Sequence, residues 1–243
     1  LISKILYPND NHTEGKILRL RQQYFFSAAS IADILQNHLN QYGTLDNLAD
    51  KVAIQLNDTH PTVAIPEMMR ILLDECSYEW DAAFDICRKV FAYTNHTVMS
   101  EALEKWNADI FRNTLPRIWQ IVCEMDRRCR ADLAKAFPGD QGKIDYMAII
   151  GDNQVRTANI CAYTCHAING SVFHDYFLYK PQAFKNVTNG IAYRRWLLCS
   201  NPGLTHLLEE TIGDGFKTDA SELKKLEKFV DDKTVQAAAA KVK

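Results

Sequence analysis

The sequence predicts an α/β fold, in which short buried strands alternate with amphipathic helices. Residues 52–56 form a short, mostly apolar run with β-branched side chains, which is typical of a strand buried on both faces of a parallel sheet. A helix is expected from Pro66, and after a second helical stripe the run Phe91-Ala92-Tyr93-Thr94 predicts another strand. Strand, turn and helix therefore repeat in the order that a parallel sheet requires.

Apolar spacing predicts further elements along the chain. Apolar residues recur at helical intervals over 16–39 and 114–137, and an alanine-rich, charged tail over 221–243 indicates another helix. A short helix is expected over 100–106, and strands are expected over 147–150 and 159–163. We interpret the cations near the end of the 114–137 helix as a solvated face rather than a phosphate site: Arg127, Arg128, Arg130 and Lys135.

Length and composition are those of a globular protein with one large domain or two smaller ones. The 243 residues are 47% hydrophobic and 24% charged, and 28 Lys and Arg against 30 Asp and Glu give a formal net charge of -2. This balance gives no electrostatic reason to expect nucleic acid or a membrane as a partner. No apolar run is long enough to span a membrane, and the first residues lack a signal-peptide layout. The chain opens without Met, so we expect it to be a piece of a longer protein.

The cysteines indicate a reducing compartment. There are 7 of them, an odd number, scattered through apolar contexts, which is typical of buried free thiols and not of a disulfide framework. Asn-x-Ser/Thr triplets also occur, but such triplets are frequent by chance, so we predict a cytoplasmic protein. Cys161, Cys165 and His166 lack a second ligand pair at zinc spacing, so no metal site is expected there.

Polar side chains follow both predicted strands at the point where each strand ends. Asn57, Asp58, Thr59 and His60 follow the first strand, and residues 95–97 (Asn-His-Thr) follow the second. Because parallel strands joined by a helix end at the same edge of a sheet, and ligands bind at that edge, the two groups predict one site. The alternative is that Asp58 and Thr59 only cap the following helix.

The residue types at the loops and strand ends favour a sugar ligand. Planar amides, carboxylates and imidazoles both donate and accept hydrogen bonds, which a site needs to recognise sugar hydroxyls by direction. Two alternatives stay open: a metal-dependent hydrolase using Asp58, His60 and His96, and a non-catalytic carbohydrate-binding module. The side chains that carry this argument are Asp10, Asn11, Asn57, Asp58, Thr59, His60, Asn95, His96, Thr97 and Asn189.

Several motifs, in order along nearly the whole chain, resemble those of glycogen (α-1,4-glucan) phosphorylases. The longest are Leu6-Tyr7-Pro8-Asn9-Asp10-Asn11, Val52-Ala53-Ile54-Gln55-Leu56-Asn57-Asp58-Thr59-His60-Pro61, Ala92-Tyr93-Thr94-Asn95-His96-Thr97, Phe137-Pro138-Gly139-Asp140 and Thr188-Asn189-Gly190-Ile191. The resemblance implies a Rossmann-like doubly wound domain, part of a two-domain GT-B glycosyltransferase-type fold. Residues 1–187 would belong to the N-terminal glucan-binding domain, and residues 188–243 would begin the C-terminal cofactor domain.

The resemblance also implies an activity. Such enzymes cleave terminal α-1,4-linked glucose from glycogen or maltodextrin with inorganic phosphate, giving glucose 1-phosphate with retention of configuration. Pyridoxal 5'-phosphate is the cofactor and acts through its phosphate group, and the full-length enzyme is expected to be a homodimer.

The resemblance assigns roles to particular residues. His96 would be the catalytic residue, and it would hold the 6-hydroxyl end of the glucosyl unit together with Asn189. Asp10 and Asn11 would gate the entrance. The pocket beside the anomeric face of the sugar would be lined by Asp58, Thr59, His60, Thr97, Ala102 and Glu104.

Three departures from the family pattern lead to further expectations. The lysine that attaches the cofactor and the phosphate-binding residues would lie beyond Lys243, so this chain alone is predicted to bind no cofactor and to be inactive. About ten residues, roughly three helical turns, are missing after Asn169-Gly170. The connection over 36–50 is short and lacks the arginines of the nucleotide-effector site of animal enzymes, which favours a bacterial-type enzyme.

Overall fold

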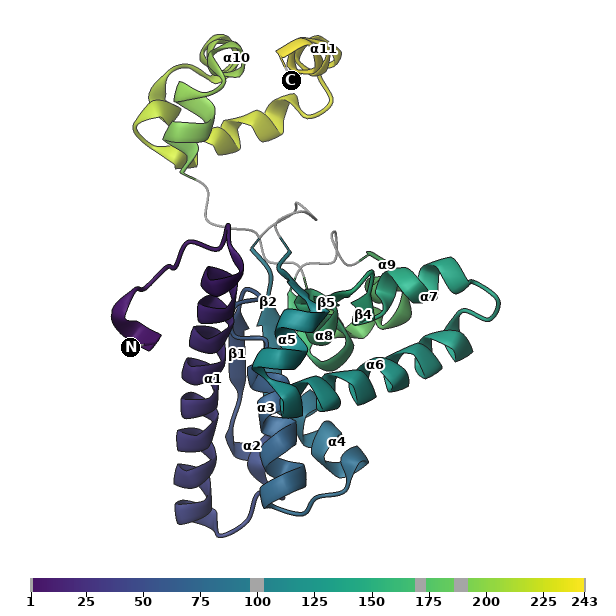
Figure 1. Cartoon of the computed structure of the whole chain (residues 1–243). Coiled ribbons are helices and arrows are strands. Elements are labelled where there is room, and N and C mark those ends of the chain that lie inside the picture. The colour runs from purple at the N-terminus through teal and green to yellow at the C-terminus, as the bar shows by residue number, and fades with distance from the viewer. Residues whose placement is uncertain (1, 97–102, 169–173, 186–191, 243) are drawn as a thin grey trace. The chain divides into compact units, whose positions relative to one another are not determined.

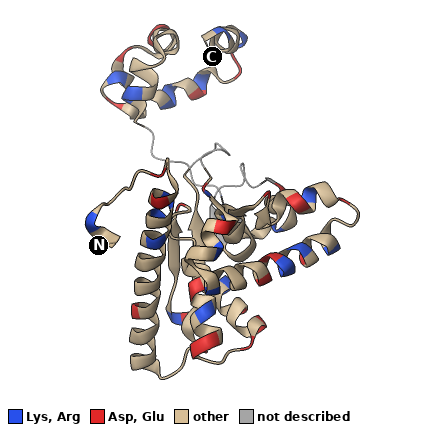
Figure 2. Ribbon diagram, viewed as in Figure 1, with Lys and Arg blue, Asp and Glu red and all other residues tan. Residues whose placement is uncertain are grey.

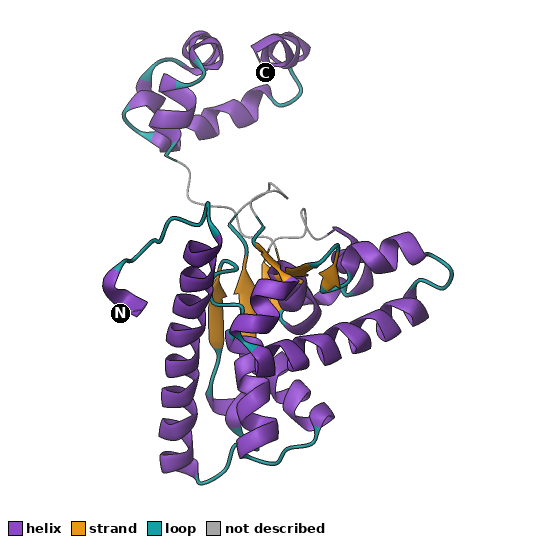
Figure 3. Ribbon diagram, viewed as in Figure 1, coloured by secondary structure: helices purple, strands orange, loops and turns teal. Residues whose placement is uncertain are grey.

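The computed structural model describes residues 2–96, 103–168, 174–185 and 192–242. Its contacts divide the chain into two compact units, Leu1–Val187 and Thr188–Lys243, which we describe separately. The first unit combines helices with two small sheets, whereas the described part of the second is helical (Figure 3). The predicted mixed α/β class is therefore confirmed. The assignment of the two units to a glucan-binding domain and a cofactor domain stays a prediction.

The first sheet of unit 1 is parallel, and its strand order is β1-β2-β6-β7. Its strands are β1 (Ile54–Asn57), β2 (Phe91–Thr94), β6 (His166–Ile168) and β7 (Phe184–Lys185). The helices that precede and connect β1 and β2 are α1 (Thr13–Tyr42), α2 (Leu48–Lys51), α3 (Ala64–Arg70), which continues into the π-type turn η2 (Ile71–Glu75), and α4 (Trp80–Val90). In β2, Phe91 and Tyr93 are fully buried, as a strand inside a parallel sheet requires.

The second sheet of unit 1 is a small antiparallel one in the order β3-β5-β4. Its strands are β3 (Lys105–Asn107), β4 (Ile150–Gly151) and β5 (Gln154–Arg156). The helices of this region are α5 (Ala108–Thr114), α6 (Pro116–Ala136), α7 (Gln141–Met147), α8 (Thr157–Thr164) and α9 (His174–Tyr179). Short 3₁₀ turns are η1 (Ile2–Lys4) and η4 (Pro181–Ala183).

Unit 2 contains a π-type turn, two α-helices and two 3₁₀ segments within its described residues. They are η5 (Arg194–Cys199), α10 (Pro202–Ile212), η6 (Gly215–Lys217), η7 (Ala220–Phe229) and α11 (Lys233–Val242). Phe216 is fully buried, and the carbonyls of Lys217 and Thr218 accept hydrogen bonds from Arg194.

Helix α1 is defined at both ends by side-chain or backbone capping. At its start, Nδ1 of His12 accepts a hydrogen bond from the N–H of Gly15 at 3.1 Å. At its end, Gly43 adopts a left-handed conformation with φ of 71°, and its N–H donates to the carbonyl of Leu39 at 2.8 Å. The sequence prediction of a helix over 16–39 is thus confirmed, and the helix extends beyond that range at both ends, from Thr13 to Tyr42.

Three sequence predictions are wrong in detail. The run 159–163, expected to be a strand, lies in the buried helix α8, because an apolar run has the same appearance in a buried strand and a buried helix. The expected helix over 100–106 lies partly outside the described residues, and its last two residues instead belong to strand β3, which begins at Lys105. The expected strand over 147–150 is divided between the end of α7 and the start of β4.

The prediction of buried free thiols is confirmed in part, because Cys76 and Cys123 are half-buried and Cys199 is exposed. All seven cysteines are free thiols, and four of them, Cys87, Cys129, Cys161 and Cys165, are buried. Within the described residues, no helix is both long enough and apolar enough to cross a membrane.

A buried carboxylate connects α1 with α3. The side chain of Glu67 is 3% exposed; it accepts hydrogen bonds from the Tyr24 hydroxyl at 2.8 Å and from Nε and Nη2 of Arg70, both at 2.9 Å. Burial, and then the Glu67 carboxylate, raise the pKa of Tyr24 to about 12, so its hydroxyl stays a donor at neutral pH. Arg70 also pairs with Glu75, whose side chain is 56% exposed.

We therefore expect Glu67→Ala to lower the free energy of unfolding by about 2 to 3 kcal/mol, because it leaves buried donors without their acceptor. Glu75→Ala removes an exposed partner of the same arginine and should cost less than about 0.5 kcal/mol. Urea unfolding of the two variants measures both values. Equal losses in the two variants would show that the burial of Glu67 does not determine how much its carboxylate stabilises the protein.

Candidate functional site

Strands β1 and β2 end at the same edge of the parallel sheet, as the sequence predicted. Their register pairs Asn57 with Thr94, and the N–H of Asp58 donates to the carbonyl of Thr94 at 2.9 Å. Beyond the strands, Nε2 of His96 lies 2.5 Å from Oδ1 of Asn57. A hydrogen bond thus joins the polar residues that follow β1 to those that follow β2.

Asp58 makes a sharp turn directly after β1. It adopts a left-handed backbone conformation with φ of 65°, and its Oδ1 accepts a hydrogen bond from the N–H of Thr59 at 2.8 Å. As a result Thr59 is buried and His60 is exposed. Helix α3 begins only at Ala64 and has no side-chain cap, so the alternative that Asp58 and Thr59 cap this helix is wrong.

His60 lies on the side of the site that faces α1. It lines a pocket of about 270 Å³ together with residues of α1 and of the segment before it. The other lining residues are Leu6, Tyr7, Arg19, Gln22, Gln23, Phe26, Ser27 and Pro61.

Glu104 is held against α1 by side chains that sequence reasoning missed. Its carboxylate accepts hydrogen bonds from Nε2 of Gln23 at 3.0 and 3.2 Å and contacts Nε of Arg19 at 3.4 Å. Its backbone carbonyl accepts a hydrogen bond from the Thr157 hydroxyl at 2.6 Å. Arg19 and Gln23 are four residues apart and so share one face of α1. That spacing was the only available signal, and it is common to most exposed helices.

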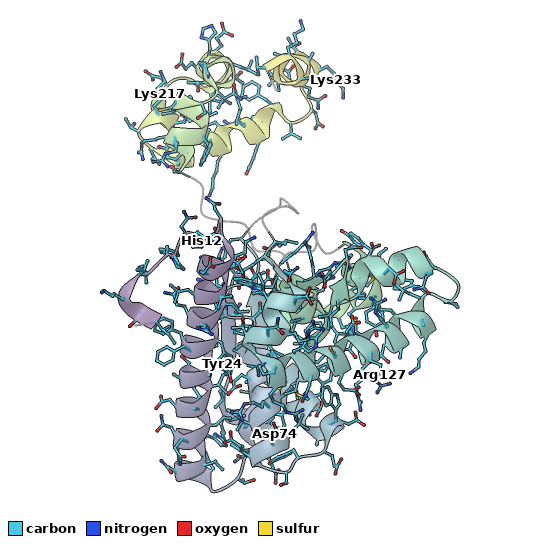
Figure 4. The ribbon with its side chains drawn as sticks, in the orientation of Figure 1. His12, Tyr24, Asp74, Arg127, Lys217 and Lys233 are labelled. Atoms are coloured by element: carbon cyan, nitrogen blue, oxygen red, sulfur yellow. The ribbon has the colours of Figure 1, made fainter. Side chains whose placement is uncertain are left out.

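The predicted gate residues precede α1. Asp10 and Asn11 are exposed, and the N–H of Asn11 donates to Oδ1 of Asn9 at 3.0 Å. The start of α1, marked by His12, lies at the end of unit 1 where β1 and β2 also end (Figures 1 and 4). The loop is therefore placed near the sheet edge, although no hydrogen bond from Asp10 or Asn11 to that edge is present among the described residues.

The predicted site residues form two groups. Asn57, Asp58 and His96 meet at the sheet edge, whereas His60 and Glu104 face α1. Asn95 is buried. Thr97, Ala102 and Asn189 lie outside the described residues.

The described side chains offer no metal site at this edge. No group of three or more His, Cys, Asp or Glu residues in the described part of the chain could hold a metal ion, and Asp58, His60 and His96 are all described. These three residues therefore do not form the site that a metal-dependent hydrolase would need.

Fold and site together define a mixed α/β protein with a cluster of polar side chains at the carboxyl ends of two parallel strands. The whole chain, residues 1–243, matches the family model for carbohydrate phosphorylases, and the chain belongs to this family. It is 46% identical to the brain form of glycogen phosphorylase from Rattus norvegicus and 43% identical to the muscle form from Homo sapiens. Both alignments cover 100% of this chain, but only 32% of the rat protein and 31% of the human protein.

The alignments also bear on the expected gaps. The alignment with the rat protein is 264 residues long, which exceeds the 243 residues of this chain by 21, so the relative has residues that this chain lacks. The shortened segments expected after Gly170 and over 36–50 stay predictions. The bacterial-type interpretation stays a prediction.

Gly15 allows the loop that contains Asp10 and Asn11 to pack closely against the start of α1. A Cβ at Gly15 would lie 1.7 Å from the carbonyl oxygen of Asn9, so the backbone before α1 approaches the helix where only glycine is tolerated. At Gly142 in α7 the nearest atom to a Cβ would be 3.8 Å away.

We expect Gly15→Ala to displace this loop and to destabilise the protein, although alanine in a free helix is favoured over glycine by about 1 kcal/mol. Gly142→Ala, the matched control, should be neutral or stabilising for that same reason. Thermal unfolding compares the two variants. A stabilising Gly15→Ala substitution would mean that the loop does not depend on the close approach.

Proposed function

We propose that the full-length protein is an α-1,4-glucan phosphorylase, which transfers terminal glucose from glycogen or maltodextrin to inorganic phosphate and yields glucose 1-phosphate. The hydrogen bond between His96 and Asn57 carries this proposal, because it fixes an imidazole at the edge where sheets of this type bind ligands. Membership of the carbohydrate phosphorylase family supports it. The chain spans about a third of the length of its relatives, so it would supply one wall of the active site.

The geometry around His96 indicates what its ring does. Since Oδ1 of Asn57 is an acceptor, Nε2 of His96 donates to it, and in the neutral ring Nδ1 then remains an acceptor. We propose that Nδ1 receives a hydrogen bond from a hydroxyl of the glucosyl unit, and that Asn57 fixes the orientation of the ring. His96 is exposed, so the ring is accessible to a ligand.

We assign the remaining predicted residues to substrate binding. Asp58, Thr59, His60 and Glu104, with Thr97 and Ala102, would line the pocket beside the sugar. Asp10 and Asn11 would close the entrance, and Asn189, which lies outside the described residues, would contact the sugar. In this arrangement Arg19 and Gln23 hold Glu104 in place from α1.

Pyridoxal 5'-phosphate would supply a phosphate group for proton transfer in the full-length enzyme. The side chains that form hydrogen bonds directly beyond β1 and β2, those of Asn57, Asp58 and His96, include no lysine. We place the attachment lysine outside this chain. We also propose a doubly wound, two-domain GT-B fold, a homodimer and a cytoplasmic location for the full-length protein.

The activity is tested by release of glucose 1-phosphate from maltodextrin by the full-length protein, with and without inorganic phosphate. His96→Ala should lower kcat/KM about a hundredfold, because a positioned donor or acceptor at the reacting sugar is lost. His206→Ala, an exposed histidine of α10 paired with Glu209 and Glu210, should behave as wild type.

Asn57→Ala should lower kcat/KM less than His96→Ala, and the double variant should resemble His96→Ala alone, since Asn57 acts through the ring. If protein shown to carry the cofactor releases no glucose 1-phosphate, we would instead assign it as a non-catalytic carbohydrate-binding module. A titration with maltoheptaose would then detect binding of the glucan.

The 243-residue chain alone is expected to show no absorbance band from bound pyridoxal phosphate after incubation with the cofactor, and no phosphorolysis. Absorption spectra before and after removal of free cofactor measure this. A stable band would contradict the placement of the attachment lysine if borohydride removed it and left the reduced cofactor covalently attached to a lysine of this chain.

A further inference from the structure

The segment before α1 forms one wall of the pocket that contains His60. Leu6 and Tyr7 line this pocket, whose volume is about 270 Å³, opposite residues of α1. Both side chains are nevertheless largely exposed, at 76% and 77%. None of residues 2–7 is buried, so packing in the hydrophobic core does not hold this wall in place.

Gln22 of α1 makes the polar contact that attaches this segment to the helix. Its Nε2 donates to the carbonyl of Ile2 at 2.7 Å and to the carbonyl of Ile5 at 2.5 Å. A primary amide has two N–H donors, so each carbonyl receives one of them. Ile2 is the first residue of η1, and Ile5 follows its last residue. Gln22 thus holds η1 at both ends.

The amide of Gln22 is buried, which distinguishes it from other glutamines of α1. Gln22 is 7% exposed, whereas Gln36 is exposed and donates to Asn40 of the same helix at 2.9 Å. Burial of an amide is unfavourable unless its polar atoms are hydrogen-bonded. The burial of Gln22 and the position of η1 therefore depend on each other.

The other end of the segment is held at the start of α1. The carbonyl oxygen of Asn9 approaches Gly15 so closely that a Cβ there would lie 1.7 Å from it. Figure 1 shows η1 beside the first half of α1, with which it is in contact. Leu6 and Tyr7 therefore lie in a short stretch of chain that is attached to the helix before and after them.

We propose that Gln22 is a positioning residue of the glucan site, which holds Leu6 and Tyr7 in place as a wall of the pocket. It acts through the carbonyls of Ile2 and Ile5, and because these use both of its N–H groups, none is left to donate to a sugar. The inference rests on the proposed function, which assigns this pocket to the substrate. Loss of the two donors should weaken binding of the glucan and leave the bond-breaking step unchanged.

The kinetic test compares variants of the full-length protein in the phosphorolysis of maltodextrin. Gln22→Met keeps the length of the side chain and removes both donors. We expect the KM for maltodextrin to rise about tenfold and kcat to change less than about twofold, because the wall binds the glucan equally in the ground state and the transition state. Gln36→Met, the matched control on the same helix, should leave both constants unchanged.

Trypsin provides a measurement that does not depend on activity. The turn η1, which carries positive charge in Figure 2, ends at Lys4, so the peptide bond between Lys4 and Ile5 lies between the two carbonyls that Gln22 holds. Gln22→Met should accelerate cleavage after Lys4 about tenfold, since a segment without its hydrogen bonds opens more often. Mass spectrometry follows the new end at Ile5, and Gln36→Met should be cleaved as slowly as wild type.

Gln22→Asn tests the same contact with the amide retained. Its side chain is one methylene shorter and should no longer hold both carbonyls, so we expect smaller increases in cleavage after Lys4 and in KM than for Gln22→Met. The midpoint of urea unfolding, measured for each variant, separates release of the segment from a loss of global stability.

Three results would overturn the proposal. Unchanged cleavage after Lys4 in Gln22→Met would show that Gln22 does not hold the segment. Faster cleavage with an unchanged KM would show that the segment is not a wall of the glucan site, and a lower kcat at constant KM would contradict a role in binding. If the unmodified full-length protein shows no phosphorolysis, the proposed function fails instead, and trypsin together with a maltoheptaose titration still decides the role of Gln22.

Discussion

The parallel pairing of β1 with β2 is the constraint on which the candidate site depends. The register that sets Asn57 beside Thr94 also directs the N–H of Asp58 to the Thr94 carbonyl, so the chain must turn at Asp58. That turn buries Thr59 and exposes His60. The same register brings His96, two residues beyond the end of β2, within hydrogen-bond distance of Asn57. One pairing therefore determines the positions of side chains that are 39 residues apart in the sequence.

Helix α1 provides the second support of the site. Along one helix it carries the cap at His12, the Arg19 and Gln23 side chains that hold Glu104, and the Tyr24 hydroxyl that bonds the buried Glu67. Glu67 belongs to α3, which follows the turn after β1, so its hydrogen bond with Tyr24 connects α1 to the segment beyond that turn. A helix of 30 residues thus links the predicted entrance loop, the pocket lined by His60 and the core of unit 1.

Charge pairing distinguishes the two cationic regions of unit 1. Arg127 and Arg128 of α6 are compensated by Glu124, one turn away on the same helix, and such pairs stabilise a helix slightly. Arg88 and Lys180 come from different parts of the chain and lie over the rings of Phe84 and Tyr163, respectively, and neither forms an ion pair with a carboxylate among the described residues. Interactions along one helix can be foreseen from spacing, but the stacking of Phe84 on Tyr163 depends on the packing of α4 beside α8.

The sequence by itself determined the α/β class, the bounds of β2, the long helices α1 and α6 and the shared edge at which Asn57 and His96 lie. These depend on local periodicity and on the rule that parallel strands joined by a helix end together. Tertiary structure alone decided that 159–163 is helical and that Glu104 is held by Arg19 and Gln23. The backbone hydrogen bonds of a buried apolar run can be satisfied equally well in a strand or in a helix, so the packing of neighbouring elements decides between the two structures. The contact between Gln23 and Glu104 joins residues 81 positions apart, and such a contact leaves no local pattern in the sequence.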